Sequence, residues 1–192
     1  MTTKSTEERA LLQHVIKTEA DVPLQVFNVN FSTYLFFDND ICHSHDLINA
    51  IKMVVRDSFA DDSVAAVYSS YDFSFLGELC MDDDWVAKLA SFNRRMNEEG
   101  DYHSLTIIDK TKQWALFQNT PVEDGVLGIT SNRDSGCIND LIGEFFFNCE
   151  TLAELLKEKT ERDKSLVRTI GKEYIMKMIE NYGNKLKGSR EY

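Results

Sequence analysis

Proline, glycine and long apolar runs are all scarce in this sequence of 192 residues. The two prolines, Pro23 and Pro121, and nine scattered glycines leave no flexible linker, repeat or low-complexity tract. No apolar run approaches the roughly 18 residues that cross a bilayer, and the first residues, MTTKSTEER, lack the apolar stretch of a signal peptide. We therefore expect one cytosolic domain over residues 1–192 that spans no membrane.

Motifs for cofactors and disulfides are missing as well. Neither GxGxxG nor GxxxxGK[ST] occurs, and no acidic stretch follows the twelve-residue calcium loop, so we expect no nucleotide or other cofactor. The four cysteines are 38, 57 and 12 positions apart, which fits neither a zinc ribbon nor a dense disulfide framework. We expect reduced thiols, and the chain has no recognisable catalytic signature.

Negative charge is the feature that the sequence has in excess. The chain holds 32 Asp and Glu against 21 Lys and Arg, for a formal net charge of −11. Residues 1–151 carry 25 acidic and 11 basic side chains, net −14, whereas residues 152–192 carry 7 and 10, net +3. A surface of this sign repels nucleic acid and attracts basic proteins, so we expect a basic protein partner and no nucleic acid.

Hydrophobic patterning predicts a mainly antiparallel sheet of five to six strands. Alternating apolar residues over 22–37 indicate two strands or one bent strand, and the apolar run 63–71 indicates a buried one. Strand-like segments at 104–109 and 113–118 surround a short turn and form the clearest hairpin. Residues 125–130 supply a neighbouring strand.

Helical spacing predicts about five helices, which makes the chain an α+β domain. Capping-box pairs place helix starts at Ser5 and Thr151. The other predicted helices follow Ser44, run from 82 to 100, and extend over residues 162–183 as one long amphipathic helix. The tail, residues 185–192, is expected to fray.

The densest chemical cluster lies at Cys42, His43, Ser44, His45 and Asp46. One interpretation makes Ser44 a helix cap, with Asp46 complementing the helix dipole. The alternatives are a metal site built from Cys42, His43 and His45, or a thiol hydrolase that uses Cys42, His43 and Asp46. The cap is favoured, because consecutive ligands rarely wrap a tetrahedral ion and no CxxC or HxxxH pair completes the set.

Pairs and triplets of carboxylates fall between the predicted elements, together with several aromatic residues. Each cluster is explained by a solvated turn or a helix cap, or by contact with a cationic partner through carboxylates that bind Arg and an aromatic anchor. The residues predicted to contact a partner are Asp61, Asp62, Asp82, Asp83, Asp84 and Trp85. The aromatic residues expected on the same negative surface are Tyr68, Tyr71, Trp85 and Tyr102.

As a small, acidic, cytosolic α+β domain without a catalytic motif, the chain resembles the immunity proteins of bacterial toxin systems, including those of contact-dependent inhibition. This resemblance implies an inhibitor of a toxin, a cationic nuclease being the most concrete partner, and it transfers no functional residue. The leading hypothesis is thus a module that neutralises or regulates a basic protein without catalysis. The alternatives are a metal-assisted or thiol hydrolase centred on residues 42–46, and a structural subunit whose helix 162–183 packs against a second copy.

Overall fold

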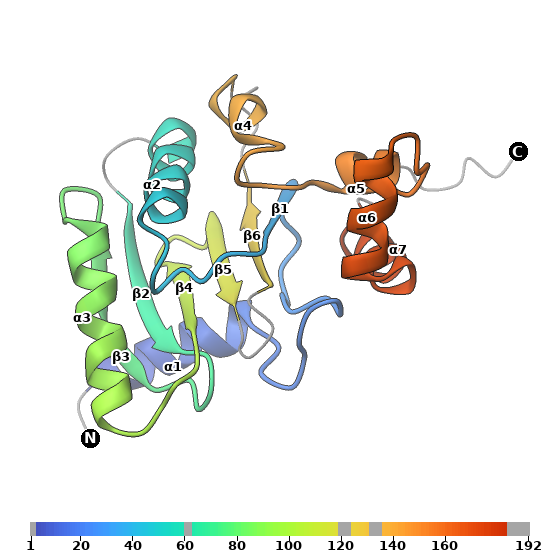
Figure 1. Ribbon diagram of the computed structural model, residues 1–192. Coiled ribbons are helices and arrows are strands. Elements are labelled where there is room, and N and C mark those ends of the chain that lie inside the picture. Colours follow the sequence, from blue (N-terminus) through green and yellow to red (C-terminus); the bar gives the residue numbers. More distant parts are fainter. Residues whose placement is uncertain (1–2, 60–62, 119–123, 131–135, 184–192) are drawn as a thin grey trace, which may run out of the picture.

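A six-stranded antiparallel sheet forms the centre of the computed structural model, which describes residues 3–59, 63–118, 124–130 and 136–183 (Figure 1). The strands are β1 (Thr33–Phe37), β2 (Val64–Ser69), β3 (Phe75–Cys80), β4 (Leu105–Asp109), β5 (Trp114–Gln118) and β6 (Gly125–Ile129). Their spatial order is β1-β6-β5-β4-β2-β3, and each neighbouring pair is antiparallel. The predicted α+β domain with a mainly antiparallel sheet is confirmed.

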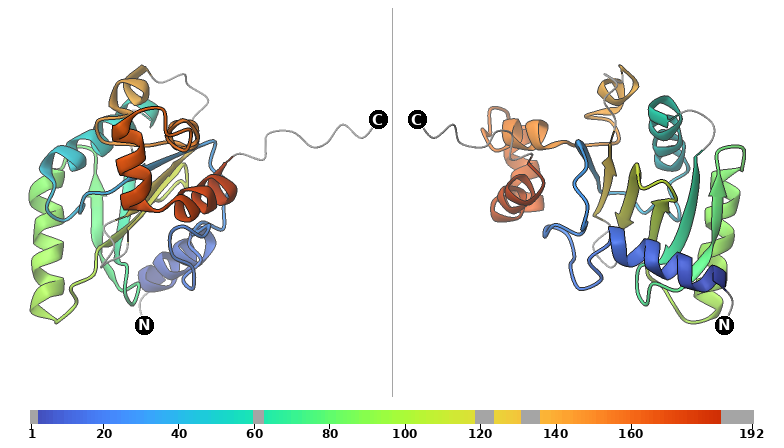
Figure 2. Two further views of the ribbon diagram at one scale, coloured as in Figure 1. Left: turned by 45° about the vertical axis from the view of Figure 1, so that its right-hand side comes forward. Right: turned by 180° about the vertical axis from the view of Figure 1, so that it is seen from behind.

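Helices lie against both faces of the sheet and at one of its edges. They are α1 (Thr3–Val15), α2 (His45–Phe59), α3 (Trp85–Glu98), α4 (Gly136–Leu141), α5 (Cys149–Leu155), α6 (Glu161–Ile170) and α7 (Lys172–Tyr182). Helices α2 and α3 cover one face, and α1 crosses the other (Figure 2). Helices α5 to α7 gather beside β1 (Figure 1). Among these described helices, none has the length and apolar character needed to cross a membrane.

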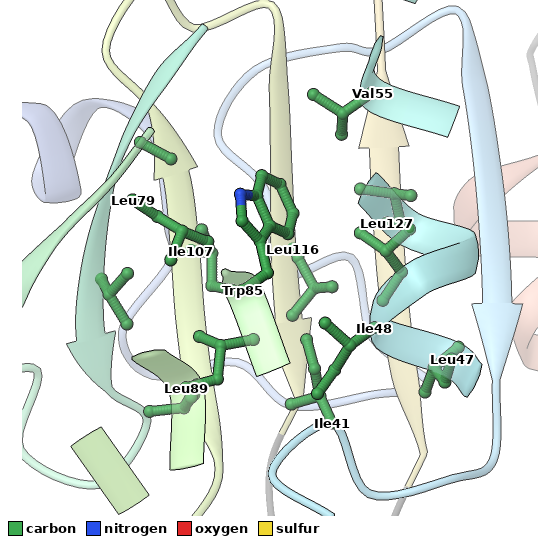
Figure 3. Packing of buried hydrophobic residues seen from close by; sticks show 14 of the residues in the cluster. Ile41, Leu47, Ile48, Val55, Leu79, Trp85, Leu89, Ile107, Leu116 and Leu127 are labelled. Atoms are coloured by element: carbon green, nitrogen blue, oxygen red, sulfur yellow. The ribbon is translucent and has the colours of Figure 1, made fainter. Parts of the chain in front are cut away.

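The core has two layers because the central strands are buried on both faces. Every residue of β4, β5 and β6 is buried, as expected when apolar side chains occupy both sides of a strand. In the first layer, the ring of Trp85 from α3 stacks on Trp114 with centroids 6.1 Å apart. Figure 3 shows the side chains that α2 and α3 place on this face, among them Leu47, Ile48, Trp85 and Leu89, above Ile107, Leu116 and Leu127.

Several predicted elements occur where the patterns placed them. The 104–109 and 113–118 hairpin is β4 and β5, segment 125–130 contains β6, and β2 lies inside 63–71. Strand β3 was missed, because Gly77 and Glu78 interrupt its apolar residues and a register shift opposite Val67 and Tyr68 disturbs its alternation.

The segment predicted as strands over 22–37 contains only β1, at its end. The aromatic side chains that precede β1 cover the sheet instead of extending it. A Cβ atom added to Gly128 of β6 would lie 2.2 Å from the Phe31 ring, so only a glycine at this position allows the ring to pack against the strand. The Tyr34 hydroxyl accepts a hydrogen bond from the Phe31 amide at 3.0 Å and holds the segment in place.

Three predictions about helix ends were wrong. Helix α1 already includes Thr3, before the expected cap Ser5, and α5 is capped by Asn148, with Thr151 as the third residue of its capping box. The single helix over 162–183 is divided into α6 and α7 at Gly171, whose φ is 97° and ψ is 122°. The predicted frayed tail, 185–192, lies outside the described residues.

The break at Gly171 leads to a first prediction. Side chains strongly disfavour this backbone conformation, so Gly171→Ala should lower the free energy of unfolding by about 1–2 kcal/mol. The control is Gly136→Ala, because Gly136 begins α4 with open space around it. Denaturant unfolding should show no loss for the control, and equal stability of the two variants would contradict the strained break.

Candidate functional site

The Cys42 to Asp46 segment leads into α2, which begins at His45. The Ser44 hydroxyl accepts a hydrogen bond from the Leu47 amide at 3.4 Å, and its carbonyl accepts one from the Ile48 amide at 3.0 Å. Asp46 lies in the first helical turn, where its charge complements the helix dipole. This geometry confirms Ser44 as the helix cap.

The thiol of Cys42 is buried and has a raised pKa, whereas a nucleophilic thiol is accessible and has a lowered one. The residue is 6 % exposed, and burial together with the charge of Asp40 raises the pKa of its thiol to about 12. His43 is paired elsewhere, since its Nδ1 lies 2.6 Å from Asp40 Oδ2. Asp46 is exposed on the helix. The predicted set of Cys42, His43 and Asp46 therefore has no activated thiol.

The alternative metal site at Cys42, His43 and His45 is not formed either. Across the described parts of the chain, no three His, Cys, Asp or Glu side chains are grouped as metal ligands. All three residues line the Tyr102 side of the start of α2, but their environments differ. Cys42 is buried, His43 is exposed beside Asp40 and Asn93, and His45 is exposed in the first turn of α2.

The Asp82 to Asp84 triplet closes the turn between β3 and α3. Asp83 accepts hydrogen bonds from Lys88 Nζ and the Cys80 amide, both at 2.6 Å, and these bonds lower the pKa of its carboxyl. Asp84 caps α3 by accepting a bond from the Ala87 amide at 3.0 Å. Asp83 and Asp84 thus have structural roles, although Asp84 is exposed, as is Asp82.

Trp85 is a core residue, so its predicted role as an exposed anchor is corrected. It is 2 % exposed and stacks on Trp114, and its Nε1 donates to the Cys80 carbonyl at 2.8 Å. A tryptophan in the first turn of an amphipathic helix faces the core when that turn starts directly above the sheet. The other two predicted contacts, Asp61 and Asp62, lie outside the described residues.

Two of the predicted surface aromatics do face solvent. Tyr68 is 1 % exposed and donates its hydroxyl to the Glu8 carbonyl, but Tyr71 and Tyr102 are 66 % and 73 % exposed. Tyr71 lies in the turn after β2, and Tyr102 lies in the segment that leads into β4. Since β2 and β4 are neighbours in the sheet, both tyrosines occur at the same end of it.

The carboxylate of Asp101 ties these two segments together. It accepts bonds from the Ser69 hydroxyl at 2.5 Å and from the backbone amide and Nδ1 of His103, both at 2.9 Å. The Ser69 hydroxyl accepts in turn from the Tyr71 amide at 3.0 Å. The Tyr71 and His103 rings are stacked, with centroids 4.4 Å apart and an interplanar angle of 17°.

The charge of Asp101 is favoured by these bonds. Burial alone would raise the pKa of its carboxyl, but the donors from Ser69 and His103 outweigh burial and lower it below its usual value. Asp101 is therefore a poor base for Ser69, which is itself fully buried. The arrangement positions rings at the surface and has no activated hydroxyl.

Each exposed tyrosine lines a hollow of its own. The Tyr102 hollow, of about 560 Å³, lies between the start of α2 and the second half of α3, and His43, Arg94, Glu98 and Tyr102 are among its lining residues. The Tyr71 hollow, of about 220 Å³, is lined by Glu19, Asp21, Tyr71, Phe73 and His103 among others.

Exposed carboxylates follow the same two segments. Asp72 is next to Tyr71, while Glu98 and Glu99 end α3 just before Asp101. We call the two hollows and the side chains of Asp72, Glu98 and Glu99 the acidic aromatic surface. The chemistry around Tyr71 suits the cationic side chains of a protein, because rings and carboxylates both attract them. The Tyr102 hollow also contains Arg94.

Sequence reasoning identified Tyr71 and Tyr102 but did not place Asp101 or His103 beside them. The available signal was an Asp-Tyr-His run between a predicted helix and a predicted strand. The partner that gives Asp101 its role is Ser69, which is 32 residues away. Only the pairing of β2 with β4 brings the two together, and no local pattern shows that pairing.

Alkylation should confirm the inert environment of Cys42. With a pKa of about 12, roughly one thiol in ten thousand is ionised at pH 8. Iodoacetamide should modify Cys42 at least about a hundredfold more slowly in the native protein than in urea, because only the thiolate reacts. Peptide mapping follows the site, with Cys42→Ser as the control, and rapid native modification would restore the nucleophile hypothesis.

Asp101→Asn should destabilise the domain in a pH-dependent manner. The folded pKa of Asp101 is lowered, so its contribution is present above the unfolded value of about 3.9 and is lost as the pH falls through the folded value. We expect a loss of about 1–2 kcal/mol at pH 7. In denaturant unfolding, this difference should shrink as the pH falls below the unfolded value of about 3.9.

Glu99→Gln provides the matched control for Asp101→Asn, because Glu99 is exposed nearby. Its stability should stay within about 0.5 kcal/mol of the wild type at every pH. A loss for Asp101→Asn that did not change as the pH fell from 7 to well below the unfolded value of about 3.9 would contradict the role of its charge.

Comparisons with known proteins provide no family for this geometry. No protein-family model, curated protein or solved structure matches the chain. The functional interpretation therefore depends on the side chains at the acidic aromatic surface and on the charge of the chain.

Proposed function

We propose that this protein is a binding module that neutralises or regulates a basic protein partner in the cytoplasm, without catalysis. One observation supports this most directly. The two tyrosines Tyr71 and Tyr102 are 66 % and 73 % exposed, and Asp101 and His103 fix the segments that carry them. They belong to the part of the chain, residues 1–151, that holds 25 acidic and 11 basic side chains.

Exposed tyrosines in a fixed frame favour protein binding. A tyrosine adds a large contact area for little conformational entropy, and tyrosine is common among the residues that dominate interface energies. The hydrogen bonds of Asp101 and the ring stack order the surface before a partner arrives, which reduces the entropy lost on binding.

The charge favours a basic partner. A net charge of −14 over residues 1–151 accelerates encounter with a cationic protein and disfavours the phosphate backbone of nucleic acids. Proteins that cleave nucleic acids are commonly cationic, since they bind phosphates. An immunity-type inhibitor of a toxin nuclease, the role implied by the resemblance of this chain in composition and architecture, is the most concrete version of the proposal.

The other two hypotheses have less support. The hydrolase needs an activated group in residues 42–46, where the Cys42 thiol is buried with a raised pKa. Self-association needs a free apolar stripe on the C-terminal helices, but Ile175, Met178 and Tyr182 of α7 are buried against the second core layer of the same chain. The Tyr182 hydroxyl also donates to the Leu24 carbonyl at 2.6 Å.

The test begins with capture from the host lysate by tagged wild type and by the double variant Tyr71→Ala/Tyr102→Ala. At about 50 mM salt, the wild type should retain a basic protein that the variant retains poorly, and about 500 mM salt should reduce the difference. The recovered protein is then purified, and its dissociation constant is measured. We expect the double variant to weaken binding at least about tenfold, as for residues that dominate an interface.

Matched controls are Met53→Ala and Met176→Ala, because both methionines are 53 % exposed and neither lies on the acidic aromatic surface. Their binding should equal that of the wild type. The immunity-type version further requires that wild type, but not the double variant, restores growth to cells that express the recovered protein. Equal binding by the double variant and the wild type would overturn the assignment of this surface.

A further inference from the structure

The Tyr71 hollow combines an exposed aromatic ring with a small volume. The Tyr71 ring lies against His103 on one face, and 66 % of the side chain is exposed, so its other face is open to a ligand. Phe73 and Ser70 also line this space of about 220 Å³. A volume of this size holds a side chain of a partner and not a folded element.

The carboxylates around the Tyr71 hollow favour a positively charged occupant. Glu19 and Asp21 line the Tyr71 hollow, Asp72 is next to the ring, and Asp101 lies behind His103. Among the described residues that line this hollow, none is a lysine or arginine. The Tyr102 hollow differs in this respect, since Arg94 lines it and would repel a cation.

The combination of an open ring and carboxylates favours guanidinium over ammonium. A guanidinium is planar and weakly hydrated, stacks on aromatic faces, and binds carboxylates through two parallel hydrogen bonds. A lysine ammonium is a compact, strongly hydrated charge that gains less from a ring. We propose that the Tyr71 hollow receives an arginine side chain of the basic partner, stacked on Tyr71 and bound by Glu19 and Asp21; this rests on the proposed function.

The surroundings provide room for the chain that carries this arginine. A third hollow, of about 490 Å³, shares Thr18 and Phe73 with the Tyr71 hollow and continues along α1. Its lining includes Asp72 and Phe75, together with Arg9 as its one basic residue among those described. An extended segment of a basic protein can therefore run from the Tyr71 hollow along α1 with further carboxylate contacts.

Two fluorescein-labelled peptides test the inference on the full chain: one with six arginines separated by glycines, and the same peptide with lysines. Both have the same charge, so the ratio of their dissociation constants cancels the general attraction of the acidic chain. Fluorescence anisotropy at about 50 mM salt should show the arginine peptide binding about three- to fivefold more tightly, as cation–π stacking at an exposed ring predicts.

Variants assign this preference to the hollow. Tyr71→Ala should bring the ratio close to one, whereas Tyr71→Phe, which keeps the ring, should retain it. Glu19→Gln combined with Asp21→Asn should weaken both peptides. Met53→Ala provides the matched control, since Met53 is 53 % exposed and lies outside the acidic aromatic surface, and its ratio should equal that of the wild type.

The two proposals can fail separately. A ratio near one for the wild type, or a ratio that Tyr71→Ala leaves unchanged, would overturn the arginine site, even if the salt-sensitive capture of a basic protein persisted. Conversely, a preference that depends on Tyr71, without any basic protein retained from the lysate, would support the chemistry of the hollow and contradict the proposed function.

Discussion

Both faces of the sheet are covered by other elements, so the strands themselves are not accessible to a binding partner. Strands β4, β5 and β6 are buried along their whole length, because α2 and α3 pack on one side and α1 with the aromatic segment before β1 packs on the other. Side chains available to a partner therefore come from turns and from the ends and outer faces of the helices. The acidic aromatic surface occupies such a place, where β2 ends and β4 begins.

Some carboxylates of this protein hold turns and segments in place, and others give the surface its negative charge. Their spacing in the sequence does not show which role each one has. Asp83 and Asp84 accept hydrogen bonds within the turn before α3, and Asp101 accepts hydrogen bonds from Ser69 and His103. Glu98 is exposed to a cation, and so is Asp72, which also accepts one bond from the Ser74 amide at 2.8 Å. Carboxylates with backbone or side-chain donors thus fix the frame, and the exposed ones, Asp84 included, give the surface its charge.

The sequence predicted most of the fold, because alternation and helical spacing are local properties. It predicted β2, the β4–β5 hairpin, β6, α2 and α3, but the break at Gly171 follows from a backbone conformation that spacing does not reveal. The candidate site was predicted less well. Asp84 and Trp85 have local explanations as cap and core, whereas Asp101 acquires its role from Ser69, a long-range contact made by the folded sheet.

The central claim is that a basic partner contacts the turns that carry Tyr71 and Tyr102. Hydrogen exchange of the full chain, alone and with the purified partner, tests this most directly, because buried amides in an interface exchange more slowly. The account predicts protection over residues 69–74 and 99–104, with little change over residues 82–85. Protection confined to residues 82–85, or to helices α5 to α7, would contradict it.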